Sequence, residues 1–302
     1  MDEKYCRGEE ITYMFKDKLM PYILLAPLAV LFVLPMLLSI FILVVQSLGY
    51  IPALGLNSIT LKYFFSVLKD RTFLDSLIFS MQTAVISTVL TIILGFIAAY
   101  ALSKTKEEAL VQKLVRLPLL IPHFTAAFLV FLMFSQSGGL SRVMGTMGLL
   151  HGQEAFPQMV FDSMGMGIII TYVWKEVPFA ALVLYATMKT IGAKFYDSAY
   201  NLGASELQYI MNVLVPLTLP SILSTFSILF AFNFGAFEVP FLIGPSYPKA
   251  LPVLGYISYL SPDLKNRPET MAVNILITVI CLLALYAYSK AVKAMADMKN
   301  II

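Results

Sequence analysis

The chain has 302 residues, of which 59% are hydrophobic and only 13% are charged. An ordinary soluble domain has about 25% charged residues, so this composition argues against a soluble enzyme, a disordered protein and a disulfide-stabilised secreted domain. The mean hydropathy of +0.82 is typical of a membrane protein. The 21 basic and 18 acidic residues give a net charge of only +3, which does not indicate nucleic-acid binding.

Six apolar stretches are long enough to cross a membrane, since a transmembrane helix needs about 20 mostly apolar residues. They lie at 20–46, 75–102, 116–136, 164–188, 219–243 and 270–290. The sequence therefore predicts an all-α membrane protein with six transmembrane helices. The predicted membrane domain spans 20–292, between a tail at 1–19 and a tail at 293–302.

The distribution of Lys and Arg predicts the orientation, because the cytoplasmic segments of membrane proteins carry an excess of these residues. Thirteen basic residues lie in or beside the two tails and the 103–115 and 189–218 segments. Seven lie in the segments on the opposite side, and Lys175 lies inside a predicted span. We therefore expect both termini and the 189–218 segment in the cytoplasm.

The segment 189–218 carries the clearest functional pattern. Apolar residues recur at helical spacing on each side of Gly203, where a helix would end or turn sharply. They are Phe195, Ala199 and Leu202 before the glycine and Leu207, Ile210 and Met211 after it. The sequence therefore predicts two short amphipathic helices that meet at Gly203, with Pro216 or Pro220 starting or kinking the next span.

The charge of this segment distinguishes between two roles. A helix that lies among lipid headgroups favours many basic residues on its polar face, but here Asp197 and Glu206 offset Lys194. Docking into a cleft of a soluble partner fits the sequence better. A short helix held between two long spans would transmit a movement of that partner to both of them.

The same segment resembles the signature of inner-membrane permease subunits of ABC importers. That signature reads Glu-Ala-Ala, three residues, Gly, nine residues, Ile, one residue and Leu-Pro. The corresponding residues here are Asp197, Ser198, Ala199, Gly203, Val213, Val215 and Pro216. The spacing is kept throughout, and the departures are Asp for Glu, Ser for the first Ala and Val at both aliphatic positions.

The resemblance extends over most of the chain. Stretches at 24–27, 95–102, 117–122 and 174–179 look like parts of the family's first four spans. Residues 201–205 and 237–244 are most similar to the spermidine/putrescine branch. Iron(III) permeases resemble the same stretches but often carry two such units in one longer chain.

This resemblance implies a MetI-like type I permease with a cytoplasmic coupling helix, in a bacterial-type plasma membrane. It implies pairing with a second permease subunit, docking of the 189–218 loop onto a cytoplasmic ATPase dimer, and cargo delivered by an extracytoplasmic binding protein. The implied coupling residues are Asp197, Ser198, Ala199, Gly203, Ala204, Val213 and Pro216. The implied cargo is a polyamine such as spermidine or putrescine.

The chain is not expected to be an enzyme or to hold a cofactor of its own. No G-x-x-x-x-G-K-[ST] phosphate-binding motif occurs in the sequence, so ATP and Mg²⁺ would be bound by the partner ATPase. Cys6 and Cys281 are expected in different environments, and His123 and His151 are isolated. None of these residues has metal-ligand spacing, and we predict no metal site.

Polar residues inside the predicted spans are candidates for the transport pathway or its gate. A charge at the bilayer centre costs about 2.5–3.5 kcal/mol on insertion scales, so Lys175 and Glu176 should face protein or water. Pro178 should kink the fourth span, and Asn233 and Glu238 are expected in the outer half of the fifth. An acid facing the pathway would suit a cationic polyamine, but an interhelical hydrogen bond or a structural ion pair is the alternative for such residues.

Other functions stay open on the sequence alone. Within ABC import, the cargo could be iron(III) or another small solute. An ion-coupled secondary transporter would import its cargo without ATP, although the internal repeats common in that class are not visible here. An intramembrane enzyme would need more than Lys175 and Glu176 at membrane depth.

Overall fold

The computed structural model describes residues 20–22, 24–105, 113, 115–150, 152–191 and 193–299. The predicted tail at 1–19, which includes Cys6, lies outside the described residues, as does His151. The predicted tail at 293–302 is described as far as Lys299, where the last helix ends.

Six helical runs of the described chain are long and apolar enough to cross a membrane, which confirms the predicted number. They are Met20–Ser47, Arg71–Lys104, His123–Thr146, Met166–Ile191, Glu206–Gly235 and Leu264–Lys290. The long helices within these runs are α2 (Leu34–Ser47), α4 (Arg71–Lys104), α6 (His123–Phe134), α8 (Met166–Ile191), α11 (Val215–Gly235) and α14 (Arg267–Lys299). A π-helical turn, η1 (Ala29–Val33), precedes α2.

Shorter elements connect the long helices. The helical ones are α3 (Lys62–Lys69), α7 (Gly139–Thr146), α9 (Ala193–Asn201), α10 (Glu206–Tyr209), the π-helical η5 (Ile210–Leu214), α12 (Glu238–Ile243) and α13 (Leu251–Tyr259). The 3₁₀ turns are η2 (Pro52–Leu54), η3 (Leu117–Leu120), η4 (Gln153–Ala155) and η6 (Leu264–Asn266). Two short strands, β1 (Tyr50–Ile51) and β2 (Leu56–Asn57), form an antiparallel pair.

The fifth helix differs from its predicted span, 219–243, at both ends. It ends at Gly235, and Ala236 is extended. A helix through this point would set the Pro240 ring against the carbonyl of Ala236, four residues earlier, which disfavours a continuous helix. A separate helix, α12, starts at Glu238. At the other end α10, η5 and α11 form one continuous helical run from Glu206, so the second predicted short helix is not separate.

The third helix is also displaced from its predicted span, 116–136. Residues 117–120 form a 3₁₀ turn, and α6 starts only at His123. Pro118 and Pro122 explain the delay, because a residue that precedes proline is driven out of the α-helical region. The helical run then continues past a break at 135–138 into α7.

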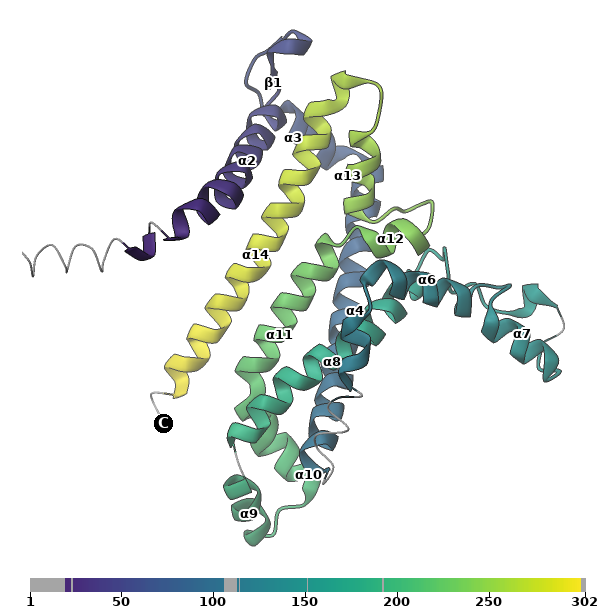
Figure 1. Cartoon of the computed structure of the whole chain (residues 1–302), viewed down its shortest axis with the longest axis vertical. Coiled ribbons are helices and arrows are strands. Elements are labelled where there is room, and N and C mark those ends of the chain that lie inside the picture. The colour runs from purple at the N-terminus through teal and green to yellow at the C-terminus, as the bar shows by residue number, and fades with distance from the viewer. Residues whose placement is uncertain are drawn as a thin grey trace, which may run out of the picture.

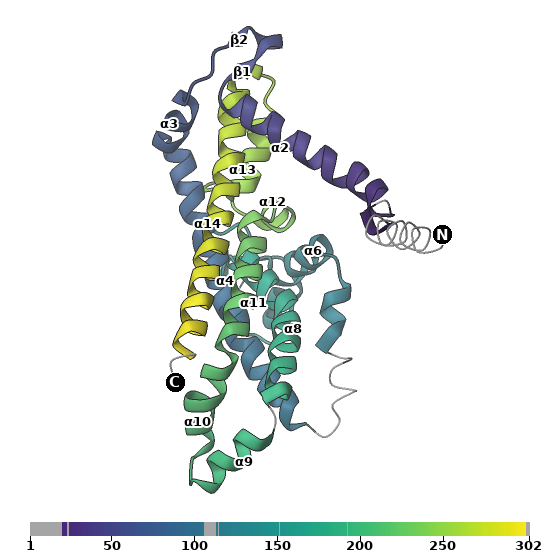
Figure 2. The ribbon, with the colours of Figure 1, turned by 90° about the vertical axis from the view of Figure 1, so that its left-hand side faces the viewer.

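The core is formed by α4, α8 and α11, with α14 packed along α11 (Figures 1 and 2). α4 and α8 approach closely: a Cβ on Gly95 would lie 2.6 Å from the Cβ of Ala180. Ala84, Ala99 and Ala181 are likewise fully buried. Small residues of this kind let the backbones of membrane helices come close enough to pack well.

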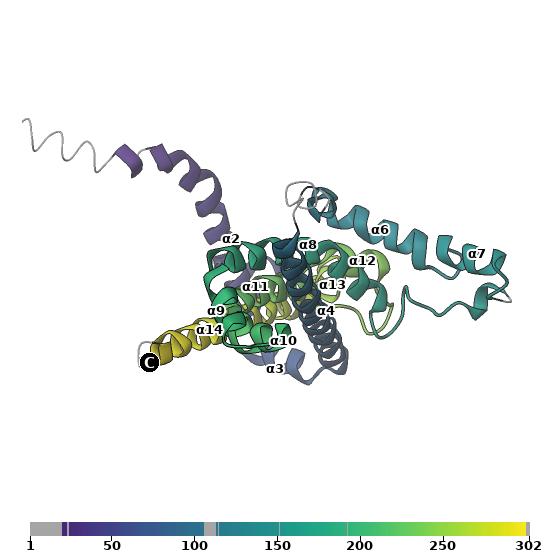
Figure 3. The same ribbon diagram turned by 90° about the horizontal axis from the view of Figure 1, so that it is seen from below.

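Two arms leave this core on different sides, as the view from below shows (Figure 3). One is the run Met20–Ser47, whose most apolar window is not buried against the rest of the chain. The other consists of α6 and α7. Their exposed apolar side chains include Phe32, Phe41, Phe124 and Met147. Apolar surface on this scale needs lipid or another protein against it.

Candidate functional site

Residues 193–209, here called the tip, protrude at one end of the molecule (Figure 1). α9 is followed by Gly203, whose φ of +81° lies in the left-handed region that glycine adopts most easily. The Gly203 N–H donates to the Tyr200 carbonyl at 2.9 Å, and the Ala204 N–H donates to the Ala199 carbonyl at 3.0 Å. This pair of bonds is a Schellman motif, so the chain turns sharply where the sequence predicts.

The start of α10 is fixed by an equally local pattern. The Ser205 hydroxyl accepts the Gln208 N–H at 3.3 Å, and the Gln208 side chain accepts the Ser205 N–H at 2.8 Å. Together they form a capping box, which satisfies two N–H groups that the helix itself leaves without partners. Pro216 lies directly after the π-helical turn η5, inside the helical run that starts at Glu206, and it supplies no N–H for an intrahelical hydrogen bond.

The tip also contacts the last turns of α4. The Lys104 ammonium lies 3.4 Å from the Glu206 carboxylate and 3.9 Å from the centre of the Tyr196 ring. Tyr100, one turn earlier, donates a hydrogen bond to Glu206. Tyr196 packs edge-on against Tyr209, with ring centres 5.1 Å apart. α4 is therefore joined to both α9 and α10.

The predicted coupling residues fall into two groups. Asp197, Ser198 and Gly203 are exposed on the tip. Ala199 and Ala204, in the same segment, are half-buried. The remaining two, Val213 in η5 and Pro216 in α11, lie on the helix that leads away from the tip. The structure thus brings together the first five residues and not the last two.

Large apolar side chains are exposed around the same turn. Leu202 is 88% exposed, Tyr200 70% and Leu207 68%. Asp197, in the same segment, is exposed as well. An apolar patch next to a charge at a protruding turn is typical of a surface that docks another protein.

A second candidate is the buried polar cluster, which consists of Ser87 and Thr88 of α4, Glu176 of α8 and Asn233 of α11. The Asn233 amide nitrogen lies 3.0 Å from a Glu176 carboxylate oxygen, 3.2 Å from the Thr88 hydroxyl and 3.4 Å from the Ser87 hydroxyl. No member of the cluster is more than 5% exposed. One amide therefore links all three core helices.

The cluster keeps unused capacity for hydrogen bonding. The second carboxylate oxygen of Glu176 and the amide oxygen of Asn233 make no hydrogen bond within the described residues. The buried hydroxyl of Thr91, one turn along α4, makes none there either. Buried polar atoms are normally satisfied by protein or ordered water, so these oxygens can accept bonds from water or from a polar ligand.

Lys175 is adjacent to Glu176 in sequence, but the two side chains have different partners. Consecutive residues do not face the same side of a helix. The Lys175 ammonium donates to the Leu119 carbonyl of η3 at 3.1 Å. Lys175 therefore holds the 3₁₀ turn that precedes α6 against α8, while Glu176 faces α4 and α11.

Pro178 and Glu238 complete the predicted pathway residues. Pro178 is buried inside α8 and, lacking an N–H, cannot bond to the Trp174 carbonyl. Glu238 is exposed in the first turn of α12, where the helix dipole favours an acid. Its predicted place in the fifth span is therefore wrong, and the extended residue Ala236 separates it from the helix of Asn233.

Sequence reasoning missed the contribution of α4 to the buried cluster. The signal was a stripe of hydroxyl residues at helical spacing, all of them buried. It runs through Ser76, Ser80, Thr83, Ser87 and Thr91. Spacings of three and four residues place such side chains on one face of a helix, and hydroxyl groups there commonly bond across to neighbouring membrane helices.

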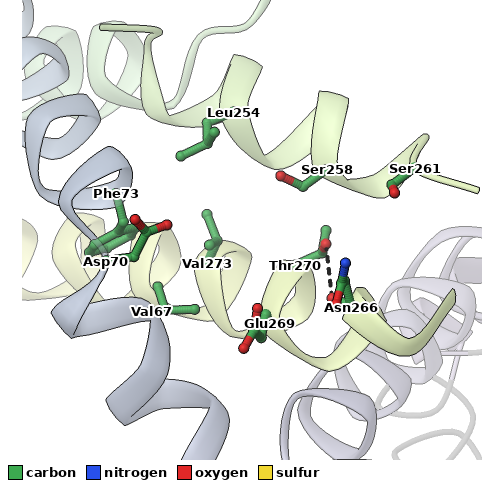
Figure 4. Close-up of a pocket in the computed structure, with 10 residues that line it drawn as sticks. All are labelled: Val67, Asp70, Phe73, Leu254, Ser258, Ser261, Asn266, Glu269, Thr270 and Val273. Carbon is green, nitrogen blue, oxygen red and sulfur yellow. Dashed lines mark hydrogen bonds between the residues drawn. The ribbon is translucent and has the colours of Figure 1, made fainter. Parts of the chain in front are cut away.

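A pocket of about 200 Å³ opens at the end opposite the tip, between α3, α13, α14 and the start of α4 (Figure 4). Asp70 and Glu269 bring carboxylates to it, and none of its ten labelled residues is basic. Asp70 caps α4 by accepting the Thr72 N–H at 2.9 Å, and Glu269 accepts the Ser66 hydroxyl at 2.8 Å. The pocket therefore carries negative charge.

A neighbouring hydrogen bond at this end of the molecule joins Tyr247 to Asp75. The bond keeps the Tyr247 hydroxyl protonated and raises its pKa above the ordinary value. Across the described residues, no three His, Cys, Asp or Glu side chains are grouped so that they could hold a metal ion.

Comparison with known proteins identifies the family to which this chain belongs. The family model of the binding-protein-dependent transport system inner membrane component matches residues 91–295. The chain belongs to this family. It is therefore a multi-pass inner-membrane protein and a permease subunit of an ABC importer.

Two curated relatives and one solved structure give the range of similarity. The spermidine/putrescine transport system permease protein PotB of Escherichia coli is 25% identical over 228 residues, which cover 74% of this chain and 80% of that protein. A probable molybdenum ABC transporter permease protein of Haloferax volcanii is 27% identical over 210 residues, which cover 69% and 72%.

The solved structure is a chain of a bacterial alginate ABC transporter in complex with an alginate pentasaccharide-bound periplasmic protein. It matches with a TM-score of 0.75 and 18% identity, over 91% of this chain and 94% of that one. This similarity in fold, together with the family match, confirms the predicted fold class, a six-helix ABC importer permease.

Proposed function

We propose that this permease subunit forms half of the membrane pathway of a polyamine importer and that its tip docks onto a cytoplasmic ATPase. The observation that carries the docking proposal is the construction of the tip. A Schellman motif and a capping box fix the turn on both sides of Gly203, and Asp197, Tyr200 and Leu202 are exposed around it. A rigid, exposed and partly apolar turn suits insertion into a cleft.

The orientation follows from the same proposal. If the tip meets a cytoplasmic ATPase, the pocket of Asp70 and Glu269 opens on the other side of the membrane, where a substrate-binding protein would deliver cargo. Both termini then lie in the cytoplasm, in agreement with the excess of Lys and Arg on that side. ATP and Mg²⁺ are bound by the ATPase and not by this chain.

The second half of the pathway comes from another permease subunit. The unburied faces of the run Met20–Ser47 and of α6 support this pairing, because they present apolar surface with no cover from the described chain. A different chain is the favoured partner. Together the two subunits would enclose the cargo on its way across the membrane.

A cationic polyamine is the cargo that the charges of this chain support best. The pocket at the outer end carries the carboxylates of Asp70 and Glu269, and Glu238 is exposed in α12. The unpaired atoms at Glu176 and Asn233 are acceptor oxygens, which suit the N–H donors of an ammonium group. The relative described as a spermidine/putrescine permease agrees with this choice.

Another small solute is the second candidate, because a relative of similar identity is described as a molybdenum permease. An oxyanion would need hydrogen-bond donors, and among the residues whose burial the structure describes, Lys175 is the buried base. Its ammonium group already donates to the Leu119 carbonyl, which weakens this candidate. Iron(III) remains the other cationic alternative.

The docking proposal is tested by purifying the tagged chain from its native membrane and identifying what comes with it. We expect an ATPase and a second permease subunit, and we expect Gly203→Asp to lose the ATPase. Gly148→Asp is the matched control: Gly148 also has a positive φ, +72°, and open space around its Cβ position, but it follows α7. ATPase recovery that is unchanged by Gly203→Asp would refute docking through the tip.

Cargo is tested separately, by uptake of labelled spermidine in proteoliposomes that contain the whole complex. Competition by putrescine but not by molybdate supports the polyamine assignment, and the reverse pattern refutes it. Uptake by this chain alone, without ATP and abolished by an ionophore, would favour an ion-coupled transporter instead.

A further inference from the structure

Three core helices meet at the buried polar cluster, and they are connected to the tip in different ways. The residue that ends α8, Ile191, is two positions before the start of α9. α11 is reached from the tip through α10 and η5 without a break in the helix. α4 has no chain connection to the tip, so a movement of the tip can reach it only through side-chain contacts.

Within the described residues, two side chains of α4, Lys104 and Tyr100, make polar contacts with the tip, and Lys104 reaches both of its helices. The Lys104 ammonium lies 3.4 Å from Glu206 of α10, 3.9 Å from the ring centre of Tyr196 of α9 and 5.4 Å from that of Tyr100 of its own helix. The Tyr100 hydroxyl adds a hydrogen bond to Glu206. A cation held between an aromatic face and a carboxylate fixes the distance and the direction between the helices that carry these groups.

We propose that Lys104 is the positioning residue that makes α4 follow the tip, so that ATP-driven movement of the tip opens and closes the buried polar cluster. This inference rests on the proposed docking of the tip to the ATPase. α4 is one continuous helix of 34 residues, and Ser87 lies 17 residues before Lys104, which is about 26 Å along the helix axis. Movement at Lys104 therefore reaches Ser87 and Thr88, which both bond to Asn233.

The apolar contacts at the same place have a different role. Ala99 and Leu102 of α4 are buried in one cluster with Leu184, Tyr185 and Tyr209. Such packing holds α4 against α8 and against Tyr209 of the tip, but it is non-directional and does not fix the direction in which α4 moves. The Lys104 contacts are about half exposed, with side-chain exposures of 43% for Lys104 and 54% for Glu206. They can therefore re-form at low cost each time the tip moves.

The test compares Lys104→Met with Lys290→Met in the complete complex of permease pair, ATPase and binding protein. Methionine keeps the length of the side chain without the charge. Lys290 is an exposed lysine in the C-terminal half of α14. Three quantities are measured: ATPase co-purification, ATP hydrolysis and cargo imported per ATP. We expect Lys104→Met to keep the first two and to lower import per ATP about five-fold, the scale of one exposed cation–π contact.

Two further variants distinguish positioning from a general loss of structure. Lys104→Arg should restore import, because arginine also pairs with carboxylates and stacks on aromatic rings. Tyr196→Leu should cause the same defect as Lys104→Met, and the double variant should be no worse than either single variant.

Three results would count against these proposals. Normal import per ATP in Lys104→Met would overturn the linkage. Loss of ATPase co-purification in Lys104→Met would also overturn it, because Lys104 would then belong to the docking surface. Failure of the unaltered chain to recover any ATPase would instead overturn the proposed function, so the two proposals can fail separately.

Discussion

The tip and the buried polar cluster are stabilised over different distances along the chain. At the tip, the hydrogen bonds around Gly203 join residues no more than five positions apart, such as Ala199 and Ala204. In the cluster, Asn233 bonds to Glu176, 57 positions away, and to Thr88, 145 positions away. Residues 200–203 at the turn are exposed, and the cluster is buried.

The tip can form on its own, whereas the buried polar cluster forms only when three helices are packed together. A turn held by local bonds keeps its shape while the helices below it rearrange, which is what a docking element must do. A cluster held by bonds among three helices exists only in the arrangement that brings those helices together. Displacing one helix would break hydrogen bonds to buried oxygens. This loss costs free energy unless water or a ligand replaces those bonds. The comparison therefore predicts that damage to the two regions has distinct consequences.

The largest effect is expected from Asn233→Leu. The substitution removes the donor that faces Glu176, Thr88 and Ser87 and leaves a buried carboxylate without a partner. Such a loss costs about 1–3 kcal/mol, so we expect lower thermal stability of the purified protein and nearly complete loss of uptake. ATPase co-purification should persist, because the tip does not depend on Asn233.

Asn274→Leu is the matched control for this experiment. Asn274 is half-buried in α14, and its amide donates within its own helix, to the Thr270 carbonyl at 3.2 Å. We expect a much smaller loss of stability than for Asn233→Leu. Equal losses in the two variants would show that the interhelical position of Asn233 is not special.

An intermediate effect is expected at the tip from Gly203→Ala. A Cβ at this position would meet no atom within 4 Å. The cost of the substitution therefore comes from the backbone conformation and not from a steric clash. The left-handed region costs a residue with a side chain about 1–2 kcal/mol, and asparagine tolerates it better than alanine. We expect uptake to fall several-fold with alanine and less with asparagine, while the loss of thermal stability stays small, because local opening of the turn relieves the strain.

Hydrogen exchange checks whether the Gly203→Ala effect is local. Amides of residues 199–205 should exchange faster in Gly203→Ala, and amides of α8 should not. A loss of protection throughout the membrane helices would contradict the view that the tip is an independent local structure.

The same distinction explains what the sequence could predict. Gly203 and its neighbours could be identified because a motif of fixed spacing encodes a local turn. Glu176 and Asn233 could be singled out as polar residues in apolar spans, but their pairing could not be predicted, because it depends on how α8 and α11 pack. Lys104 was missed for the same reason, since Glu206 lies 102 positions away.

The helix ends show a second limit of the sequence. Apolar composition continues from 219 to 243, so hydropathy alone gives no sign of a break. Pro240 disfavours a helix through Ala236, but α8 keeps Pro178 and α11 keeps Pro220 inside a helix, so a proline in the sequence does not by itself predict the break. The consequence of the break is functional, because it moves Glu238 from the predicted span to the exposed start of α12.

A smaller effect at the tip is expected from Ser205→Ala. The change removes the hydroxyl of the capping box, and the loss of an N-cap typically costs about 1 kcal/mol. The first turn of α10 should fray, but the helix beyond it is continuous with α11 and should persist. We expect uptake to fall about two-fold and Ser205→Asp to restore it, because aspartate is an equally good cap. A defect that aspartate does not restore would mean that the hydroxyl itself contacts the partner.

The smallest effect is expected from neutralising the pocket of Figure 4 with Asp70→Asn and Glu269→Gln. Asparagine still caps α4, and glutamine can still accept the Ser66 hydroxyl, so the double variant changes charge and little else. If the pocket attracts a cationic cargo, the KM for spermidine should rise about two-fold at low salt. The difference should vanish near 1 M salt, where the screening length is about 3 Å. Glu154→Gln removes an exposed acid from η4 and serves as the control. A KM that is unchanged at low salt would show that cargo does not sense the charge of this pocket, and the charge argument for a cationic cargo would then rest on Glu176 and Glu238 alone.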